Sequence, residues 1–257
     1  MAGTILSSDQ NGVRTLALNR PRRLNALNSE LLSDLNAALG AAQKDESAKV
    51  IVLCGTGRAF CSGDDLKEFG EQAGSEVAVR RHIEAIQNIT RLVVLGDKVV
   101  LGAIHGWAVG GGLEWAINCD LAIFAEDTRC FFPEIRWGMF PTGGVTAILP
   151  RLIGLQRTRE LMLFGAEFDA RQALDMKLAW KVVSNDQLRA FVQETAERIA
   201  ALPQGSVRDL KRVLNRAGSI DVEGALALET EATVRSFLDP ETRRRVGEFQ
   251  RARQEQN

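Results

Sequence analysis

The sequence has few of the residues that build metal sites and disulfide frameworks. Its 257 residues include only two histidines, His82 and His105, which lie far apart and in no spacing typical of a metal site. The four cysteines show no C-x-x-C spacing, so we expect reduced thiols in a cytoplasmic protein. These scarcities argue against a metal bound by histidine or cysteine.

Long apolar runs and an excess of one charge are also lacking. The longest apolar runs, such as 50–54 and 99–104, are far too short to span a bilayer. The first residues contain no basic region followed by an apolar stretch, so we expect no signal peptide. The 32 basic residues nearly balance the 33 acidic ones, and the net charge is −1. Neither nucleic acid nor a membrane is therefore expected as the main partner.

Hydrophobic periodicity predicts alternating strands and helices in the first part of the chain. Two strands are expected around the turn that ends at Gly12, and Asn28 is a predicted cap for a helix over 29–44. The apolar run 49–54 is typical of a strand buried on both faces. Further predicted elements are a helix over 76–95, a strand over 99–104, a helix over 112–118 and short strands at 121–124 and 129–131. We therefore expect an α/β fold.

The pattern becomes almost wholly helical after residue 143. Pro203 and Gly205 mark a boundary, which divides the chain into residues 1–200 and a helical region over 201–257. Apolar positions recur along the last helices and need a partner surface, either on the same chain or on a neighbouring subunit. These positions are Ala225, Leu226, Leu228, Ala232, Val234 and Phe237.

The most informative stretch pairs glycine-rich turns with two glutamates. Residues 106–114 read GWAVGGGLE and end at Glu114, and residues 132–144 read FPEIRWGMFPTGG and contain Glu134. Glycines that lead into a helix leave backbone N–H groups free at a positive helix end, where they can hold an anion or an oxyanion. If the two carboxyl groups converge there, they supply an acid and a base.

A second glycine-bearing turn follows the predicted strand 49–54. Residues 57–68 read GRAFCSGDDLKE, and two adjacent strands that end in such turns can direct N–H groups at one point. Neither loop matches G-x-G-x-x-G or G-x-x-x-x-G-K-[ST], so a nucleotide phosphate site is poorly supported. Taken singly, each loop is better explained as a tight turn without function, because turns are what glycine mainly serves.

Five segments in order resemble the enoyl-CoA hydratase/isomerase family, the crotonase superfamily. They are LNRPRRLNAL at 18–27, AFCSGDDLK at 59–67, the run 106–114 with Cys119 and Asp120, Pro133 with Glu134 and Ile135, and LPRLIG at 149–154. The resemblance covers roughly residues 5–195. It implies a crotonase-like core of repeated β-β-α units that binds and transforms acyl-CoA over 1–200, and a C-terminal helical oligomerisation region over 201–257. It also implies a homotrimer or homohexamer.

The family's oxyanion hole is formed by two backbone N–H groups, which correspond here to those of Asp64 and Gly111. Such donors stabilise the enolate that forms when charge moves onto the thioester oxygen, by about 3–4 kcal/mol each. The two glutamates that act on water in the family's hydratases correspond to Glu114 and Glu134. Glu114 lies in the first turn of a helix, which favours its ionised form and a role as base. Glu134 lies among apolar residues, which favours a raised pKa and a role as acid.

The resemblance also suggests binding residues by motif position. Arg22, Arg23 and Leu24 correspond to contacts with the nucleotide part of coenzyme A, although an exposed basic loop explains the two arginines equally well. The remaining candidates are Ser62, Asp65, Leu66, Lys67, Trp107, Gly110, Pro133 and Phe140, of which Trp107 and Phe140 would flank the acyl group. The two aromatic residues are equally plausible as core.

Position 64 departs from the family pattern, in which a small residue is more common. The N–H of Asp64 can still serve the oxyanion hole, but a nearby carboxylate opposes enolate formation unless it turns away or is paired. The expected activity is addition of water to a trans-2-enoyl-CoA, in fatty-acid or related acyl-CoA catabolism, with no cofactor apart from the coenzyme A of the substrate. An enoyl-CoA isomerase is the alternative, and a non-catalytic RNA-binding protein on the same scaffold is a distant one.

Overall fold

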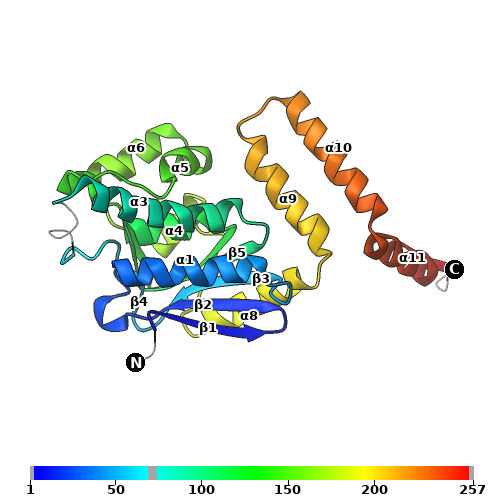
Figure 1. Cartoon of the computed structure of the whole chain (residues 1–257), viewed down its shortest axis with the longest axis horizontal. Coiled ribbons are helices and arrows are strands. Elements are labelled where there is room, and N and C mark those ends of the chain that lie inside the picture. The colour runs from blue at the N-terminus through cyan, green and yellow to red at the C-terminus, as the bar shows by residue number, and fades with distance from the viewer. Residues whose placement is uncertain (1–2, 69–73, 255–257) are drawn as a thin grey trace.

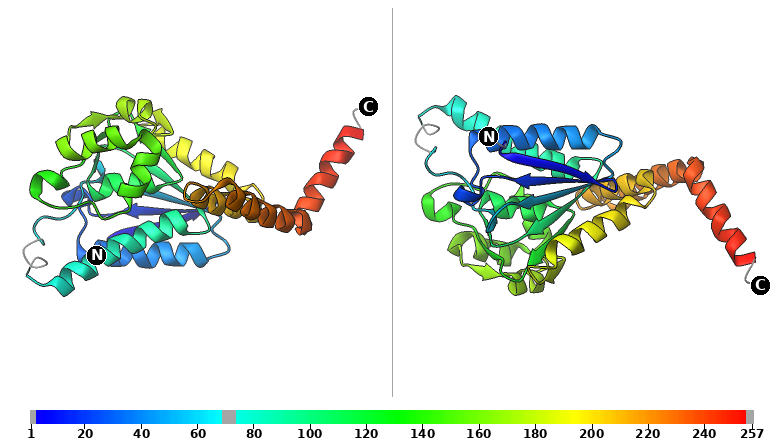
Figure 2. Two further views of the ribbon diagram at one scale, coloured as in Figure 1. Left: turned by 90° about the horizontal axis from the view of Figure 1, so that it is seen from above. Right: turned by 90° about the horizontal axis from the view of Figure 1, so that it is seen from below.

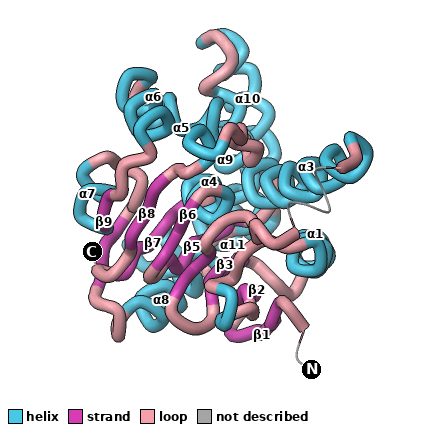
Figure 3. The backbone as a smooth tube through the Cα atoms, turned by 90° about the vertical axis from the view of Figure 1, so that its left-hand side faces the viewer, coloured by secondary structure: helices cyan, strands magenta, loops and turns pink. Residues whose placement is uncertain are grey.

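Two β-sheets form the centre of the protein (Figures 1 and 3). The computed structural model describes residues 3–68 and 74–254. The larger sheet has six strands in the order β1-β2-β3-β5-β7-β10, and all neighbours are parallel except β1 and β2. Its strands are β1 (Ile5–Gln10), β2 (Val13–Leu18), β3 (Val50–Gly55), β5 (Val99–Ile104), β7 (Leu121–Ala125) and β10 (Lys181–Val183).

The smaller sheet has four strands in the order β4-β6-β8-β9, of which the first three are parallel. They are β4 (Ala59–Cys61), β6 (Trp107–Val109), β8 (Arg129–Phe131) and β9 (Phe168–Asp169). Each of β4, β6 and β8 follows directly on a strand of the larger sheet, namely β3, β5 and β7. Two strands and then a helical segment occur four times along the chain, beginning at β1, β3, β5 and β7, which confirms the predicted crotonase-like α/β architecture.

The helices cover both faces of the larger sheet. They are α1 (Ser29–Lys44), α3 (Glu76–Thr90), α4 (Gly111–Asn118), α5 (Val145–Ile153), α6 (Leu155–Phe164), α7 (Ala170–Asp175), α8 (Leu188–Ala200), α9 (Gln204–Ala217), α10 (Val222–Leu238) and α11 (Pro240–Gln254). Short helical segments are η1 (Pro21–Arg23), the π-helical turn η2 (Arg91–Leu95) and η3 (Glu134–Trp137). Asn28 caps α1 by accepting a hydrogen bond from the N–H of Leu31, as its sequence predicts.

Alternate side chains of β3 enter two different hydrophobic clusters. Ile51 and Leu53 join the main core, where the two sheets and helices such as α1 and α4 meet. Val50 and Val52 point to the opposite face, where they pack with residues of α8 such as Val192. This two-sided burial is the physical reason for the nearly continuous apolar run in the sequence.

The last three helices project away from the sheets at one end of the molecule (Figure 2). Helices α9 and α10 pack against each other, and α10 contacts α11. Large apolar side chains on this projecting arm are exposed, for example Leu214 at 64% and Phe237 at 74%. The C-terminal region is therefore helical, as predicted. Of its apolar positions, Leu226, Val234 and Phe237 are exposed, while Ala225, Leu228 and Ala232 are half-buried.

A buried lysine attaches α9 to the body of the protein. The Nζ atom of Lys211 donates hydrogen bonds to the carbonyl oxygens of Val93 and Lys98 at 2.7 and 2.8 Å. It also lies 2.7 Å from the carboxylate of Asp120. Lys211 is only 6% exposed, so its charge is satisfied by these partners rather than by solvent.

Candidate active site

Three loops meet where the parallel strands of the smaller sheet end. Strand β4 leads to Gly63 and Asp64, β6 leads to Gly110 and the start of α4, and β8 leads to Glu134. Because parallel neighbours end at the same edge of a sheet, these loops lie side by side. The sequence had placed the glycine turns directly after β3 and β5, but the short strands β4 and β6 intervene and carry them.

The backbone around Asp64 fixes the direction of its N–H group. Leu27 donates from its N–H to the carbonyl of Gly63, and its own carbonyl accepts from the N–H of Asp65. Successive peptide groups alternate in direction along an extended strand, so the N–H of Asp64 points away from Leu27. Asp64 lines the central pocket. The geometry thus agrees with a donor that faces a bound ligand.

The second predicted donor lies at the start of α4. Gly110 has a φ of +51°, a conformation that suits glycine, and a Cβ atom there would lie 2.6 Å from the Oε1 atom of Glu134. Gly111 follows as the first residue of the helix, where N–H groups have no partner within the helix. Gly111 lines the same pocket as Asp64. The glycines therefore allow the backbone of α4 to approach Glu134 closely.

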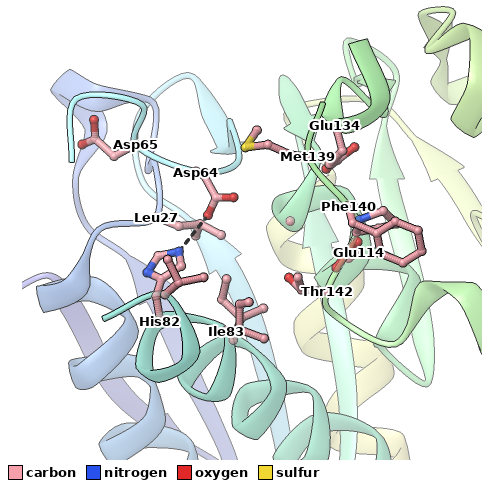
Figure 4. Close-up of a pocket in the computed structure, with 14 residues that line it drawn as sticks. Leu27, Asp64, Asp65, His82, Ile83, Glu114, Glu134, Met139, Phe140 and Thr142 are labelled. Atoms are coloured by element: carbon pink, nitrogen blue, oxygen red, sulfur yellow. Dashed lines mark hydrogen bonds and ion pairs between the residues drawn. The ribbon is translucent and has the colours of Figure 1, made fainter. Parts of the chain in front are cut away.

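The pocket has a volume of about 380 Å³ and brings both glutamates together with the two predicted backbone donors (Figure 4). Its lining residues are Leu27, Asp64, Asp65, Val79, His82, Ile83, Ile86, Gly111, Glu114, Glu134, Met139, Phe140, Pro141 and Thr142. Aliphatic and aromatic side chains form most of the wall. A pocket of this kind suits a mostly apolar group that carries one reactive polar centre.

Glu114 is almost completely buried, with 1% of its surface exposed. Its Oε2 atom accepts a hydrogen bond from the N–H of Gly143, and its Oε1 atom has no hydrogen-bond partner among the described residues. Burial, followed by the charge of Glu134, raises the pKa of Glu114 to about 8. The free oxygen is available to a water molecule or a substrate atom.

Glu134, at the start of η3, lies on the same side of the pocket as Glu114 and is 8% exposed (Figure 4). Burial raises its pKa to about 7, as the apolar neighbours in the sequence predict. The prediction for Glu114 was wrong: we expected the helix end to favour its ionised form, but burial outweighs the helix dipole. Two carboxyl groups with pKa values near neutrality are suited to exchanging protons at physiological pH.

Asp64 has a partner that the sequence did not reveal. Its Oδ1 atom lies 3.3 Å from the Nε2 atom of His82, which comes from α3. The imidazole side chain is 14% exposed and lines the pocket. His82 belongs to no recognisable motif, and only its helical spacing from Val79 and Ile86 placed it on the same face of a predicted helix.

The predicted binding residues fall into two groups. Asp65 and Phe140 line the pocket, although Asp65 is paired with Arg20 at 3.0 Å and Phe140 is 70% exposed. The pocket lining does not include Trp107, whose ring instead packs edge-on against Phe131 with centroids 6.2 Å apart. Also outside the lining are Arg22, Arg23, Leu24, Ser62, Leu66, Lys67, Gly110 and Pro133. The roles of all these residues stay predictions.

In the part of the chain that the structure describes, no group of three or more histidine, cysteine, aspartate or glutamate side chains is placed to hold a metal ion. Within residues 3–68 and 74–254, no helix combines the length and the apolar character needed to cross a bilayer.

A pocket with two backbone donors and two glutamates, built on β-β-α repeats, defines a crotonase-type site. A family model described as enoyl-CoA hydratase/isomerase matches residues 8–255. The chain therefore belongs to the enoyl-CoA hydratase/isomerase family of the crotonase superfamily, and it is an enzyme of this kind.

Known relatives with different activities resemble the chain to a similar degree. A short-chain-enoyl-CoA hydratase from Clostridium acetobutylicum is 31% identical over 229 residues, which are 89% of this chain and 87% of the relative. A 1,2-epoxyphenylacetyl-CoA isomerase from Escherichia coli is 32% identical over 230 residues, or 88% and 87% of the two chains. The family is thus certain, while the particular reaction differs among its members.

Solved structures agree with the fold. An enoyl-CoA hydratase from Bacillus anthracis matches with a TM-score of 0.91 and 31% identity, and covers 97% of this chain and 96% of its own. An enoyl-CoA hydratase from Mycobacterium smegmatis matches with a TM-score of 0.92 and 28% identity, over 98% and 97% of the two chains. The match extends over nearly the whole chain, including the C-terminal helices.

Proposed function

We propose that the protein adds water across the 2,3 double bond of a trans-2-enoyl-CoA to give a 3-hydroxyacyl-CoA. The observation that carries this proposal is the pair of buried carboxyl groups, Glu114 and Glu134, which line one pocket together with Asp64 and Gly111, whose N–H groups are the proposed donors. Hydration needs one group to take a proton from water and another to give a proton to C2. The backbone donors would stabilise the enolate oxygen between these two events.

In this proposal Glu134 gives the proton to C2 and Glu114 takes the proton from water. The charge of Glu134 is the second cause of the raised pKa of Glu114, so protonation of Glu134 makes Glu114 easier to ionise. The reactive form of the pair therefore holds one proton, on Glu134. The free Oε1 atom of Glu114 would receive the water molecule.

An isomerase that moves the double bond between carbons 3 and 2 is the second candidate. It is favoured by Asp64, whose carboxylate lines the pocket in addition to the two glutamates. The test is to incubate the enzyme with a short 2-enoyl-CoA and follow the loss of the conjugated thioester absorbance. Turnover of a 3-enoyl-CoA alone would overturn the hydratase proposal in favour of the isomerase.

We also propose that the C-terminal region over 201–257 joins copies of the chain in a homotrimer or homohexamer. The exposed apolar side chains of α9 and α10 support this, because solvent-facing clusters of that kind usually mark an interface. We propose in addition that residues 1–200 form the catalytic unit, that the reaction needs no cofactor beyond the coenzyme A of the substrate, and that the protein is cytoplasmic.

A further inference from the structure

The wall of the pocket opposite the glutamates is mainly aliphatic but contains one pair of polar side chains in contact with each other. Asp64 and His82 form this pair, with the Oδ1 atom of Asp64 3.3 Å from the Nε2 atom of His82. The other residues of that wall are Leu27, Val79, Ile83, Ile86 and Asp65, whose carboxylate is instead paired with Arg20. The hydration mechanism uses only the backbone N–H of Asp64, so both polar side chains have no role in it.

The pair presents a hydrogen-bond acceptor to the cavity. Because an ionised carboxylate can only accept, the Nε2 atom of His82 is the donor to Oδ1 of Asp64. The second carboxylate oxygen of Asp64 points toward the middle of the pocket and the side of Glu134 (Figure 4). His82 is 14% exposed and holds Asp64 in this orientation from α3. A ligand that enters the pocket therefore meets an oriented acceptor on this wall.

The side chain of Asp64 is 38% exposed in the free protein, so it is hydrated there. A purely hydrocarbon acyl group seated against it would displace this water and supply no donor in its place. A buried acceptor left without a donor is unfavourable, so the site discriminates against ligands that supply none. We propose that Asp64 and His82 select enoyl-CoA substrates whose acyl group carries a hydroxyl, which donates a hydrogen bond to Asp64. This inference rests on the proposed acyl-CoA function and names the class of acyl group.

The charge of the pocket supports the same selection. Among the described residues, the lining contains four carboxyl groups and neither lysine nor arginine. Asp65 is paired with Arg20, and burial raises the pKa values of Glu114 and Glu134, so the repulsion of an anion comes mainly from Asp64. An acyl group with its own carboxylate would be repelled. A carboxylate beside the thioester oxygen opposes enolate formation unless it turns away or is paired. The hydrogen bond with His82 provides that pairing for Asp64.

Binding of saturated acyl-CoA thioesters tests the inference without any turnover. Calorimetric titration would compare hexanoyl-CoA with analogues that carry a hydroxyl or a methoxy group at C4, C5 or C6. The methoxy group has nearly the same polarity but no hydrogen to donate. At one of these positions the hydroxyl analogue should bind roughly 10- to 100-fold more tightly than its methoxy counterpart.

Two variants and a matched control assign the preference to the pair. Asp64→Ala removes the acceptor while its backbone N–H remains, and His82→Phe removes the orienting donor but keeps a ring on α3. Both should bring the ratio of hydroxyl to methoxy affinity close to one. Ile83→Val changes the same wall without changing its polarity, and should leave that ratio within about twofold. Circular dichroism of each variant establishes that it is folded.

The outcomes separate this inference from the proposed function. Equal affinity for hydroxyl and methoxy analogues at all three positions would overturn the inference, even if 2-hexenoyl-CoA is hydrated. A preference that persists in both Asp64→Ala and His82→Phe would overturn it as well. A preference that is lost in both variants supports it, even if no enoyl-CoA is hydrated and the hydratase proposal fails.

Discussion

The carboxyl group of Glu114 accepts a hydrogen bond from the backbone N–H of Gly143. This contact connects the first turn of α4 with the turn that precedes α5. It leaves no room for a side chain at position 143, since a Cβ atom there would collide with the Oε2 atom of Glu114. One oxygen of the glutamate is thus fixed by the fold, while the other is left to the substrate or its water.

The first prediction concerns the two glutamates. Glu114→Gln and Glu134→Gln should each lower the rate of hydration of a short 2-enoyl-CoA by about 10²-fold or more, because each removes a group that carries a proton. The amide keeps the size of the side chain, so packing is preserved. Steady-state kinetics with crotonyl-CoA measure the effect, with Glu84→Gln on the exposed side of α3 as the control. A near-normal rate would remove that residue from the mechanism.

The second prediction separates the roles of the two carboxyl groups. A saturated acyl-CoA cannot be hydrated, but its C2 hydrogens can exchange with solvent deuterium. This exchange needs the carboxyl group that transfers a proton to and from C2. We expect Glu134→Gln to abolish this exchange and Glu114→Gln to retain a substantial part of it. Mass spectrometry of butyryl-CoA recovered from deuterium oxide provides the measurement. The opposite result would exchange the roles of acid and base.

The third prediction concerns stability and pH. The pKa of Glu114 is about 8 in the folded protein, against an ordinary value of 4.5. Between these values the folded state binds a proton that the unfolded state does not, so stability falls as the pH rises from about 4.5 through 8. Glu114→Gln lacks this loss. The difference in free energy of unfolding, variant minus wild type, should therefore be more positive at pH 8.5 than at pH 5.5, by on the order of 1 kcal/mol or more.

Urea denaturation at pH 5.5, 7 and 8.5 measures this difference. The exposed Glu84→Gln variant again serves as the control, because removing a solvated carboxyl group should change the free energy of unfolding by little at any of these values. If the difference in free energy of unfolding between Glu114→Gln and the wild type is the same at all three pH values, Glu114 is ionised in the folded protein from pH 5.5 to 8.5.

The fourth prediction concerns the attachment of α9. Lys211→Met removes the cation that pairs with Asp120 and leaves two buried carbonyl groups without their donor. Loss of one partner of a buried ion pair costs about 3–5 kcal/mol. The neighbouring Arg212→Met breaks an exposed pair with Asp97 and a longer contact of 3.9 Å with Asp209, which keeps its pair with Arg235. This change should cost at most about 1 kcal/mol. Similar urea midpoints for the two variants would contradict this account of Lys211.

The fifth prediction concerns assembly. The side chain of Phe237 is 74% exposed on α10, so Phe237→Glu should weaken a trimer or hexamer by placing a charge at its interface. Glu223→Lys, at the start of the same helix, changes charge without removing an apolar contact. Sedimentation velocity of the wild type and both variants is the measurement. A wild-type protein that sediments as a monomer would exclude the proposed assembly.

Much of the fold and the core of the site could be predicted because they depend on local pattern. The apolar run of β3, the cap at Asn28 and the glycines before Glu114 each reflect a requirement of nearby backbone. Strands β4 and β6 were not predicted, because the three residues of each lie within segments that the surrounding glycines mark as turns. Their presence moves the glycine turns to the edge of a second sheet.

The remaining features depend on contacts between distant segments. His82 meets Asp64 only because α3 packs beside the loop after β4, which no spacing in the sequence expresses. The pKa of Glu114 was expected in the wrong direction for the same reason. The helix end is visible in the sequence, whereas burial depends on what the rest of the chain packs over the carboxyl group.

The alternating peptide directions at Asp64 have a consequence for how this site can be investigated. The proposed oxyanion donors are main-chain N–H groups, which every residue except proline supplies. Alanine substitution at position 64 or 111 keeps the backbone N–H, so an alanine scan would not measure what this group contributes to catalysis. Replacing a single amide by an ester at position 64 or 111, through chemical synthesis or ligation, deletes the donor itself and would measure it directly.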